Sequence, residues 1–325
     1  MRSANLQWTA TACVATAILA AGTIGTAEAA PGPREWLDRM AAAVRGTNYE
    51  GTVIRMQGGT VEALKVVHVV AEGVVHEKVI VQEGNGLEII RNGNEVQCIL
   101  PDEKSVLVEE WNDQSALFAS VPSSDIDLGS EYDVAIVRTE RVAGRKTVLL
   151  AIRPHDGYRF AHRIWLDTET GFPLQTKLIG DDGSLIGHVK FADIRINQKI
   201  QPSALAPTIS TENFHWFTNP KRNVSPAVET RWVCDKLPSG FRVVSSHQEE
   251  VPGNDAPVTH ILYSDGLANV SVFIARTRDK QPAHPSRVGA SNSYSSQIDD
   301  YQVTAVGEVP AETVKQIAKS MRRSE

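Results

Sequence analysis

Cysteine is scarce in this sequence, with only three among 325 residues, and no paired Cys-Xaa-Xaa-Cys motif occurs. That absence excludes the common thiolate metal and redox motifs. Cys13 falls in a leader that we expect to be removed, so Cys98 and Cys234 remain, one in each half of the chain. An oxidising compartment would permit a bridge between them, whereas two separate buried thiols are the simpler interpretation. The sequence leaves both open, because it does not show whether their Cα atoms approach within the roughly 7 Å that a disulfide requires.

Charge of one sign is not concentrated along the chain either. The formal net charge is -6, and no basic stripe stands out that would follow a phosphate backbone, which argues against nucleic-acid binding. Hydrophobic residues make up 42% and charged residues 22%, values typical of globular proteins, so neither disorder nor a membrane bundle is indicated. A length of 325 residues suggests about two domains.

One apolar run stands out near the N-terminus. Arg2 precedes an alanine-rich run from Trp8 to Ile24, and Ala27-Glu28-Ala29 offers small residues for a cleavage site. The run is short for a membrane-spanning helix, so cleavage is favoured over an uncleaved anchor. Residues 1–29 are therefore predicted to be a signal peptide, and the mature chain to be exported.

The motifs of common enzymes are missing as well. There is no Gly-Xaa-Ser-Xaa-Gly elbow, no His-Glu-Xaa-Xaa-His and no phosphate loop, and the nine histidines are scattered. His155 and Asp156 are typical of a turn, and His162 alternates on a predicted strand. Asp265 is best explained as a turn former, and the run Asp181–Gly183 lacks the full ligand spacing of a calcium loop. The sequence thus predicts a binding protein rather than an enzyme, with no catalytic residue, metal or cofactor.

The stretch from Leu87 to Trp111 carries the clearest structural pattern. Asn92-Gly93 is a strong hairpin signal, because both residues tolerate the positive φ of a type I′ turn. The run Pro101–Lys104 marks a second turn, since proline presets φ and aspartate can hydrogen-bond the backbone two residues on. Three short antiparallel strands are therefore expected here.

Apolar residues alternate along these strands. In the middle strand Val96, Cys98 and Leu100 share one face at period two. Val106 and Val108 are expected to continue the same apolar face across the next turn. What that face covers, a helix or a ligand, is the functional question for this part of the chain.

Similar patterns extend over the first two hundred residues. A helix is expected over Pro33 to Val44, and further strands over Tyr49–Met56, Glu62–Ala71, Val74–Gln82, Tyr132–Val142, Arg145–Arg153, Arg159–Asp167, Pro173–Ile179 and Ser184–Ile196. The segment Asn112–Asp133 interrupts them and fits a helix or a flap over the sheet. One large, curved antiparallel sheet that tends toward a barrel is the simplest assembly.

A second, smaller set of strands follows a proline-rich interval. Residues 201–227 are expected to be an interdomain linker. Beyond it, strands are expected over Trp232–Cys234, Phe241–Ser246, Val258–Tyr263, Ala268–Ala275, Val288–Ser295 and Tyr301–Val309. A last helix begins at Pro310, and its buried stripe is predicted to comprise Val314, Ile317, Ala318 and Met321. The predicted fold class is mainly β (α+β).

Several longer motifs stand in the order found in a known family. The first half contains Glu88–Asp102, Arg141–Arg145, Tyr158-Arg-Phe160 and Trp165–Pro173. The second half contains Trp232-Val233, Leu237–Phe241, Tyr263–Ala268, Val270–Phe273 and Tyr301–Pro310. Together these motifs resemble the MucB/RseB family over nearly the whole mature chain.

This resemblance implies a fold and a function. The implied fold begins with a large domain over 30–200, which is similar to lipoprotein carriers and forms a half-open antiparallel β-barrel with plugging helices. The linker over 201–227 follows. A small β-sheet domain with a C-terminal helix then covers 228–325. Members of the family are periplasmic regulators that bind the periplasmic part of a membrane-anchored anti-sigma factor. They shield it from regulated proteolysis and so repress an envelope-stress sigma factor, until lipid, lipopolysaccharide or lipoprotein signals loosen the complex. A periplasmic lipid or lipoprotein carrier or chaperone is the alternative on the same large fold.

Candidate site residues follow from this hypothesis. An acyl chain or a plugging helix is expected to meet the covered face of the large sheet at Val53, Val96, Leu100, Val106 and Val108. The partner is expected to meet the linker and small domain at Phe214, Trp216, Trp232, Phe241, Tyr263, Asp265 and Phe273, because aromatic side chains suit interface anchors. For each residue ordinary core packing is the competing explanation. The sequence leaves the oligomeric state open, a homodimer included.

Overall fold

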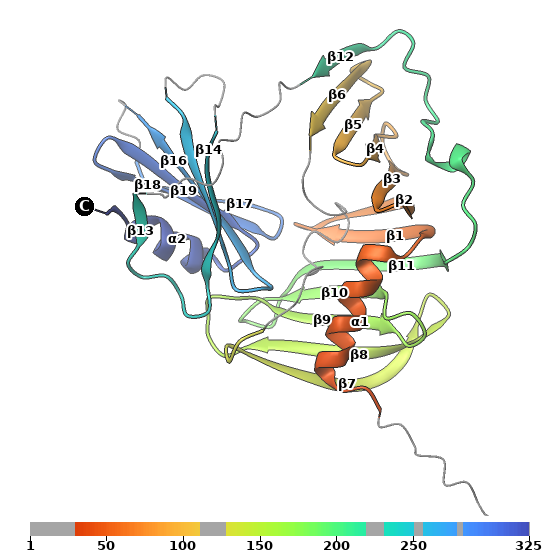
Figure 1. Cartoon of the computed structure of the whole chain (residues 1–325), viewed down its shortest axis with the longest axis horizontal. Coiled ribbons are helices and arrows are strands. Elements are labelled where there is room, and N and C mark those ends of the chain that lie inside the picture. Colours follow the sequence, from red (N-terminus) through yellow and green to blue (C-terminus); the bar gives the residue numbers. More distant parts are fainter. Residues whose placement is uncertain (1–29, 111–127, 219–230, 250–255, 278–281, 325) are drawn as a thin grey trace, which may run out of the picture. The chain divides into compact units, whose positions relative to one another are not determined.

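The computed structural model describes residues 30–110, 128–218, 231–249, 256–277 and 282–324 (Figure 1). The predicted signal peptide over 1–29 and most of the interruption predicted over Asn112–Asp133 lie outside the described residues. No helix in the described ranges is long and apolar enough to cross a membrane.

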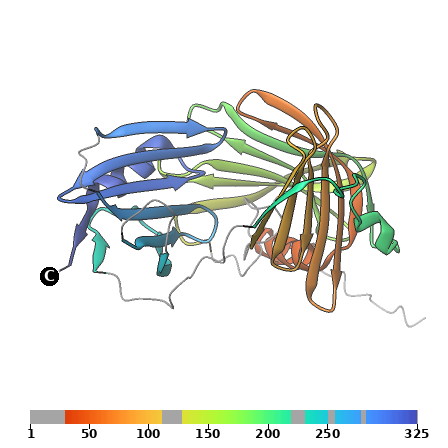
Figure 2. The ribbon, with the colours of Figure 1, turned by 90° about the horizontal axis from the view of Figure 1, so that it is seen from above.

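The first half of the chain forms a sheet of twelve strands in the order β12-β6-β5-β4-β3-β2-β1-β11-β10-β9-β8-β7 (Figure 1). The strands are β1 (Tyr49–Gln57), β2 (Thr60–Ala71), β3 (Val74–Val81), β4 (Glu88–Asn92), β5 (Glu95–Leu100), β6 (Ser105–Glu110), β7 (Tyr132–Val142), β8 (Arg145–Pro154), β9 (Ala161–Asp167), β10 (Pro173–Ile179), β11 (Leu185–Ile196) and β12 (His215–Thr218). Neighbouring strands are antiparallel except β12, which joins β6 in parallel. β12 and β7 end the sheet, so the barrel is not closed. Figure 2 shows how strongly the sheet twists between β2–β6 and β8–β11.

Helix α1 (Pro33–Gly46) packs on one face of this sheet. Pro33 suits the first helical turn because the amide hydrogen that proline lacks would have no partner inside the helix. The buried stripe of α1 joins residues of β1, β8 and β9 in one core, with Met40 fully buried at its centre. Truncating such a methionine to alanine costs about 2–5 kcal/mol of stability. The prediction of a large, open antiparallel sheet is confirmed here, and α1 is the α-helix that the described residues place on it.

The pairing of β5 with β6 contradicts one prediction about which residues share a face of the sheet. Val106 lies opposite Ile99 and Val108 opposite Gln97, and directly opposed residues project to the same face. Val96 and Leu100 therefore project to the other face, together with Val53 and the α1 core. The expectation that Val106 and Val108 continue the face of Val96 and Leu100 is wrong, because the four residues of the turn over 101–104 pair Leu100 with Ser105.

The segment after β11 covers the second face of the large sheet. Its short 3-10 helix η1 (Pro202–Leu205) contacts β3, and two polar side chains of the sheet hold the chain beyond it. The Nζ of Lys78 donates to the carbonyl of Ala206, and Glu88 Oε2 accepts from the backbone amide of Thr208 at 3.0 Å. The described part of the interval predicted to be a linker is thus attached to the large sheet and ends in β12.

The second half of the chain forms a six-stranded antiparallel sheet in the order β14-β15-β16-β19-β18-β17. Its strands are β14 (Arg242–Glu249), β15 (Val258–Ser264), β16 (Asn269–Arg276), β17 (His284–Val288), β18 (Ser291–Ile298) and β19 (Tyr301–Gly307). Helix α2 (Ala311–Ser320) packs over β18 and β19, and a ribbon of β13 (Trp232–Cys234) and β20 (Met321–Arg323) lies beside it. Val272, Val303, Val314 and Ile317 form the centre of this core.

Two predicted boundaries in this half are wrong. The strand expected over Val288–Ser295 begins only at Ser291, as β18, because Gly289 adopts a φ of +60° and turns the chain back from β17, which ends at Val288. A side chain there would also collide with Gln57, whose Cγ lies 2.6 Å from the position of a Cβ. Met321 was expected on the last helix, but it is extended and pairs with Cys234 across the ribbon, while remaining buried.

Cys98 and Cys234 are both free thiols. Cys98 is half-buried on β5, and the Sγ of Cys234 lies 3.1 Å from the Oγ of Ser320. Of the two interpretations of the cysteine pair, the one with separate thiols is therefore confirmed.

Candidate functional site

A buried cluster of charged and aromatic residues joins the two sheets. Arg159, in the loop before β9, has a fully buried side chain and donates from Nε to Asp265, in the turn after β15. Its Nη1 donates to Asp156, and its Nη2 donates to the backbone carbonyl of Ser239, just before β14. One guanidinium group thus holds partners from both halves of the chain. We call Arg159, Asp265, Tyr132, Asp156 and Phe241 the junction cluster.

Asp265 is positioned by its own turn. Its Oδ1 accepts from the backbone amides of Leu267 at 3.0 Å and Ala268 at 2.7 Å, and its Oδ2 accepts from Arg159 and from the hydroxyl of Tyr132 at 2.8 Å. Every side of the carboxylate therefore has a donor, which offsets the cost of burying the charge. Sequence reasoning identified Asp265 as a turn former and as a partner contact. The turn is confirmed, but the carboxylate is used inside the molecule.

Two rings enclose the Arg159 guanidinium. Its Cζ lies 5.5 Å from the ring centroid of Tyr132 and 4.8 Å from that of Phe241, which is cation–π geometry. Arg159 and Tyr132 were not among the predicted site residues. For Arg159 a signal was available in the polar run around Tyr158, although the strand was predicted to begin at Arg159 and β9 begins at Ala161.

The pKa values of the cluster follow from burial and charge. Burial, with the charge of Asp265 beside the hydroxyl, raises the pKa of Tyr132 above its usual range. Burial alone would lower the pKa of Arg159, but the hydrogen bond and charge of Asp265 outweigh it and raise the pKa. Burial lowers the pKa of the nearby His162 to about 4, so this ring is neutral at pH 7. At neutral pH the junction cluster contains a fixed arginine–aspartate pair beside a neutral tyrosine, and the neighbouring His162 is neutral.

Weaker contacts surround the junction cluster. Tyr158 donates from its hydroxyl to Gln316 at 2.9 Å, and its carbonyl accepts from the hydroxyl of Thr313 at 2.8 Å. Phe160 and Leu178 of the first half form a small apolar cluster with Ala290 of the β17–β18 turn. The buried ion pair is thus the centre of the contact, and a few hydrogen bonds and one small apolar cluster surround it.

Three of the six predicted partner-binding aromatics pack in the core of the small domain. Trp232, Phe241 and Tyr263 belong to its buried core, and Phe273 stacks on His260 at 4.4 Å on the opposite face. Trp216 differs from them. It lies on β12, 52% exposed, next to Phe217, which is 58% exposed.

β12 also ends the large sheet, so its outer edge has no neighbouring strand among the described residues. Phe214, just before β12, is half-buried. An edge strand with exposed aromatic side chains is the type of surface to which another chain binds. Of the predicted contacts, Trp216 therefore retains an accessible side chain.

The predicted lipid contacts are divided between the two faces. Val53 is buried in the α1 core, and Val96 is buried on the same face with the half-buried Leu100. Val106 is fully buried and Val108 half-buried on the face that the η1 segment crosses. A single apolar surface containing all five residues does not exist.

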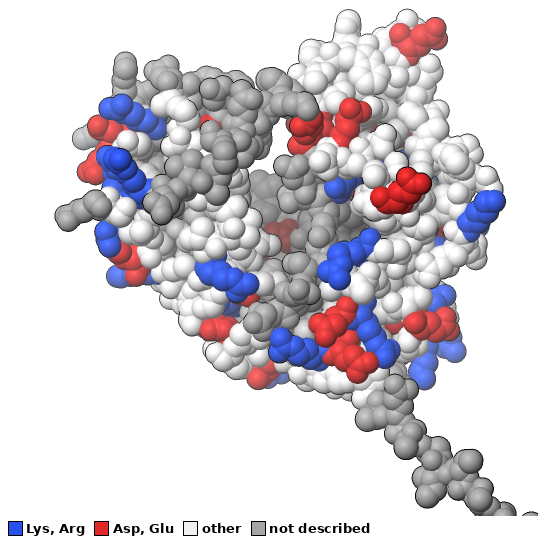
Figure 3. All heavy atoms as spheres, viewed as in Figure 1, with Lys and Arg blue, Asp and Glu red and all other residues white. Residues whose placement is uncertain are grey.

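One exposed histidine–aspartate pair lies next to the junction cluster. His155 lies 3.1 Å from Asp133, and both are exposed. No group of three or more histidine, cysteine or acidic residues in these ranges could hold a metal ion. On the face drawn in Figure 3, acidic and basic side chains are interspersed rather than gathered into a field of one sign.

Comparison with known proteins identifies relatives over about nine-tenths of the chain. The sequence model of the MucB/RseB N-terminal domain matches residues 32–209, and that of the MucB/RseB C-terminal domain matches residues 226–322. The sigma factor AlgU regulatory protein MucB of Pseudomonas aeruginosa is 29% identical over 305 residues, which cover 89% of this chain and 90% of that protein. The sigma-E factor regulatory protein RseB of Escherichia coli is 27% identical over 297 residues, covering 91% and 92%.

Solved structures agree with the sequence comparisons. The complex of Pseudomonas aeruginosa MucA and MucB contains a chain that matches with a TM-score of 0.69 at 29% identity, covering 90% of this chain and 99% of that one. A second crystal structure, of MucB with the periplasmic part of MucA, matches with a TM-score of 0.69 at 28% identity, covering 90% and 98%.

Proposed function

Because the chain belongs to the MucB/RseB family, we propose that it regulates a sigma factor by binding the periplasmic part of a membrane-anchored anti-sigma factor. Bound in this way, it protects the anti-sigma factor from regulated proteolysis and keeps an envelope-stress sigma factor repressed. The observation that carries the proposal is the match over 90% of the chain to a protein solved in complex with MucA. The relatives are named as regulatory proteins, which fits a binding role rather than catalysis.

The protein acts in the periplasm in this proposal. The predicted signal peptide over 1–29 directs export, and the partner region of MucA in the solved complex is the periplasmic one. The large domain (30–200) and the small domain (228–325) act together, with the junction cluster fixing one arrangement of the two. Trp216 on the β12 edge is the most accessible of the predicted partner contacts.

Release by a lipid is the second part of the proposal. A lipid that prefers the partner-free protein lowers affinity for the anti-sigma factor by the ratio of its affinities for the two states. The acyl chain enters the face that α1 covers, where Val53, Val96 and Leu100 lie. Val106 and Val108 on the second face are not part of this contact. The competition between the lipid and the anti-sigma factor is the same whether the protein is a monomer or a homodimer.

A pull-down followed by a protease-protection assay tests the proposal. The periplasmic part of the cognate anti-sigma factor is expected to bind the protein and to resist cleavage by its membrane protease while bound. Absence of binding and of protection would remove the regulatory function. Adding a short-chain amphipathic lipid is expected to weaken the complex, and an unchanged affinity would remove only the lipid-sensing part.

A further inference from the structure

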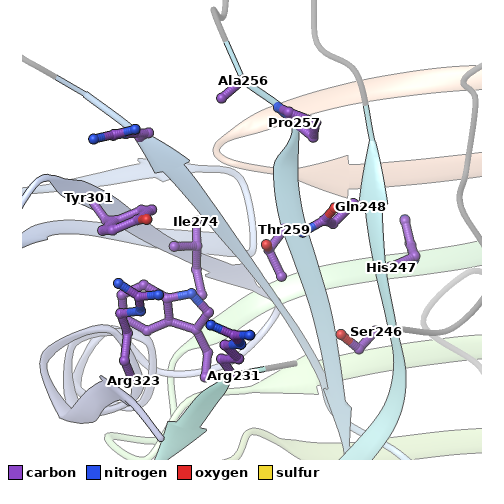
Figure 4. Close-up of a pocket in the computed structure, with 12 residues that line it drawn as sticks. Arg231, Ser246, His247, Gln248, Ala256, Pro257, Thr259, Ile274, Tyr301 and Arg323 are labelled. Carbon is purple, nitrogen blue, oxygen red and sulfur yellow. The ribbon is translucent and has the colours of Figure 1, made fainter. Parts of the chain in front are cut away.

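Two histidines meet on the face of the six-stranded sheet that α2 does not cover. His247 on β14 lies directly opposite His260 on β15, so both side chains project to the same face. Figure 4 shows His247 and Ser246 on opposite sides of β14, and the residue opposite Ser246, Ile261, belongs to the core beneath α2. The histidine pair therefore lies outside that core, on the face that carries Phe273.

The two rings approach each other through one nitrogen atom each. Nδ1 of His260 lies 3.3 Å from Nε2 of His247, and the ring planes are inclined by 78° with centroids 4.8 Å apart. A hydrogen bond across this distance places one proton between the nitrogens, and either ring can supply it. Without that proton, the same two nitrogens are neutral donors for a metal ion, since imidazole binds metals through either nitrogen.

The spacing of these nitrogens matches one class of metal ion. Zinc binds histidine nitrogens at about 2.0–2.1 Å, and two such bonds at the tetrahedral angle put the nitrogens about 3.3–3.4 Å apart. The square-planar geometry that copper(II) prefers would place adjacent nitrogens about 2.8–2.9 Å apart. Magnesium and calcium select oxygen ligands. The separation of 3.3 Å therefore fits Zn²⁺.

A third ring holds His260 in place. Phe273 lies directly opposite His260 on β16, and its ring stacks on the imidazole with centroids 4.4 Å apart and planes 15° apart. The ladder between β14 and β15 fixes the two backbones, and both histidine side chains are half-buried. Because the donors are ordered before a ligand arrives, metal binding costs little side-chain entropy.

The pair is not a closed structural zinc site. Within the described ranges no third histidine, cysteine or acidic side chain completes it. Two protein ligands leave two tetrahedral positions for water, as at zinc sites that keep open positions. β14 is an edge strand of its sheet, and Ser245, two residues before His247 and on the same face, is exposed. Water and ions therefore reach this border of the face.

We propose that His247 and His260 bind one Zn²⁺ ion, through Nε2 of the first and Nδ1 of the second, with water in the remaining positions. The ion takes the place of the shared proton, and the two neutral rings then carry their protons on Nδ1 of His247 and Nε2 of His260. The bound ion joins the edge strand β14 to β15. The inference goes beyond the proposed function, and its test contains neither the anti-sigma factor nor a protease.

Calorimetric titration of the full, untagged chain with Zn²⁺, after treatment with a chelator, tests the proposal. One ion is expected to bind saturably, whereas Mg²⁺ is expected not to compete with it. His247→Gln and His260→Gln are each expected to weaken zinc binding at least about tenfold, since even the outer-shell partners of a metal ligand contribute about 10–100-fold. Zinc is also expected to raise the urea unfolding midpoint, and to raise it no further than buffer does in His247→Gln, because only the folded chain brings the two nitrogens together.

His284→Gln is the matched control. His284 is exposed on the same face, in a row of directly opposed residues that continues from His260 through Phe273, Thr304 and Ser295. It lies on β17 at the other edge of the sheet, four strand spacings from β15, or about 19 Å. Its loss is expected to leave zinc binding unchanged.

The outcomes separate a metal site from a simple hydrogen bond. Unweakened zinc binding by both His247→Gln and His260→Gln would overturn the proposal and leave the pair as two hydrogen-bonded rings. Equal weakening by His284→Gln would overturn it as well, because zinc would then bind without the pair. If His260→Gln lowers the urea midpoint in the absence of zinc, through loss of its packing on Phe273, the result for His247→Gln decides.

Discussion

The side chains of Arg159 and Asp265 form a buried ion pair although 106 positions separate them in the sequence. Each lies in a loop beside a different sheet, and each is held by further hydrogen bonds from its own half of the chain. The pair therefore couples the two sheets through one well-satisfied contact. Breaking a buried pair from one side leaves the other charge without compensation, which costs more than the pair contributes when intact.

Asp265→Asn is expected to destabilise the protein by about 3–5 kcal/mol, because Arg159 then stays buried without its main counter-charge. Urea unfolding followed by tryptophan fluorescence measures this change. Asp235→Asn serves as control, since it removes the exposed pair with Arg322 and is expected to cost about 0–1 kcal/mol. Equal unfolding midpoints for the two variants would show that the junction cluster does not contribute to stability.

Stability is expected to fall between about pH 6.5 and pH 4 partly because of His162. Burial lowers its folded-state pKa to about 4, below the ordinary histidine value near 6.5. In this window the unfolded chain binds a proton at His162 and the folded chain does not, so the free energy of unfolding decreases as the pH decreases. The full difference corresponds to at most about 3 kcal/mol.

His162→Gln removes that titration and is expected to flatten the pH dependence in this window. Urea midpoints of both proteins at pH 7, 5.5 and 4 give the comparison. His155→Gln, at an exposed histidine 3.1 Å from Asp133, is the control for replacing an imidazole by an amide. A His162→Gln slope identical to that of the unchanged protein would contradict the burial argument.

Local turn chemistry made most of the fold predictable, and long-range pairing made the rest unpredictable. The hairpin expected at Asn92-Gly93 does join β4 to β5, but its loop residues are Gly93, at a φ of +63°, and Asn94, while Asn92 pairs with Glu95 in the ladder. Gly289 makes a similar turn, but its neighbours Val288 and Ala290 are apolar, so the sequence pattern there is typical of a continuous strand. The strand β12 was not predicted, because its parallel pairing with β6, about a hundred residues earlier, leaves no pattern in the sequence of either segment.

The site was harder to predict than the fold for the same reason. Aromatic residues such as Trp232 and Tyr263 have the composition of interface anchors, yet their alternation on strands places them in the core. Arg159 carries no periodic signal, since its role depends on a turn in the other sheet. Trp216 remained a candidate because it lies in a polar interval, where the sequence pattern predicts no strand or helix that would bury its side chain.

The two thiols are expected to react with a maleimide reagent only slowly in the folded protein at pH 7. Burial, together with the charge of Glu109, raises the pKa of Cys98, and burial raises that of Cys234 despite its contact with Ser320. In denaturant without reductant both are expected to be labelled, as intact mass spectrometry would show. Labelling that requires reductant would reveal a disulfide and contradict the free-thiol structure.

Trp216→Ser is expected to weaken binding to the periplasmic part of the anti-sigma factor by about tenfold or more, while leaving the unfolding midpoint unchanged. The reason is that the ring is 52% exposed on an edge strand, so it contributes little to folding but offers a large surface to a partner. Biolayer interferometry with the immobilised partner measures the affinity. Val61→Ser, at an apolar residue of similar exposure on β2, is the matched control and is expected to bind normally. Equal affinities of the two variants would move the partner surface away from β12, whereas a loss confined to Trp216→Ser would locate it on the open edge of the large sheet.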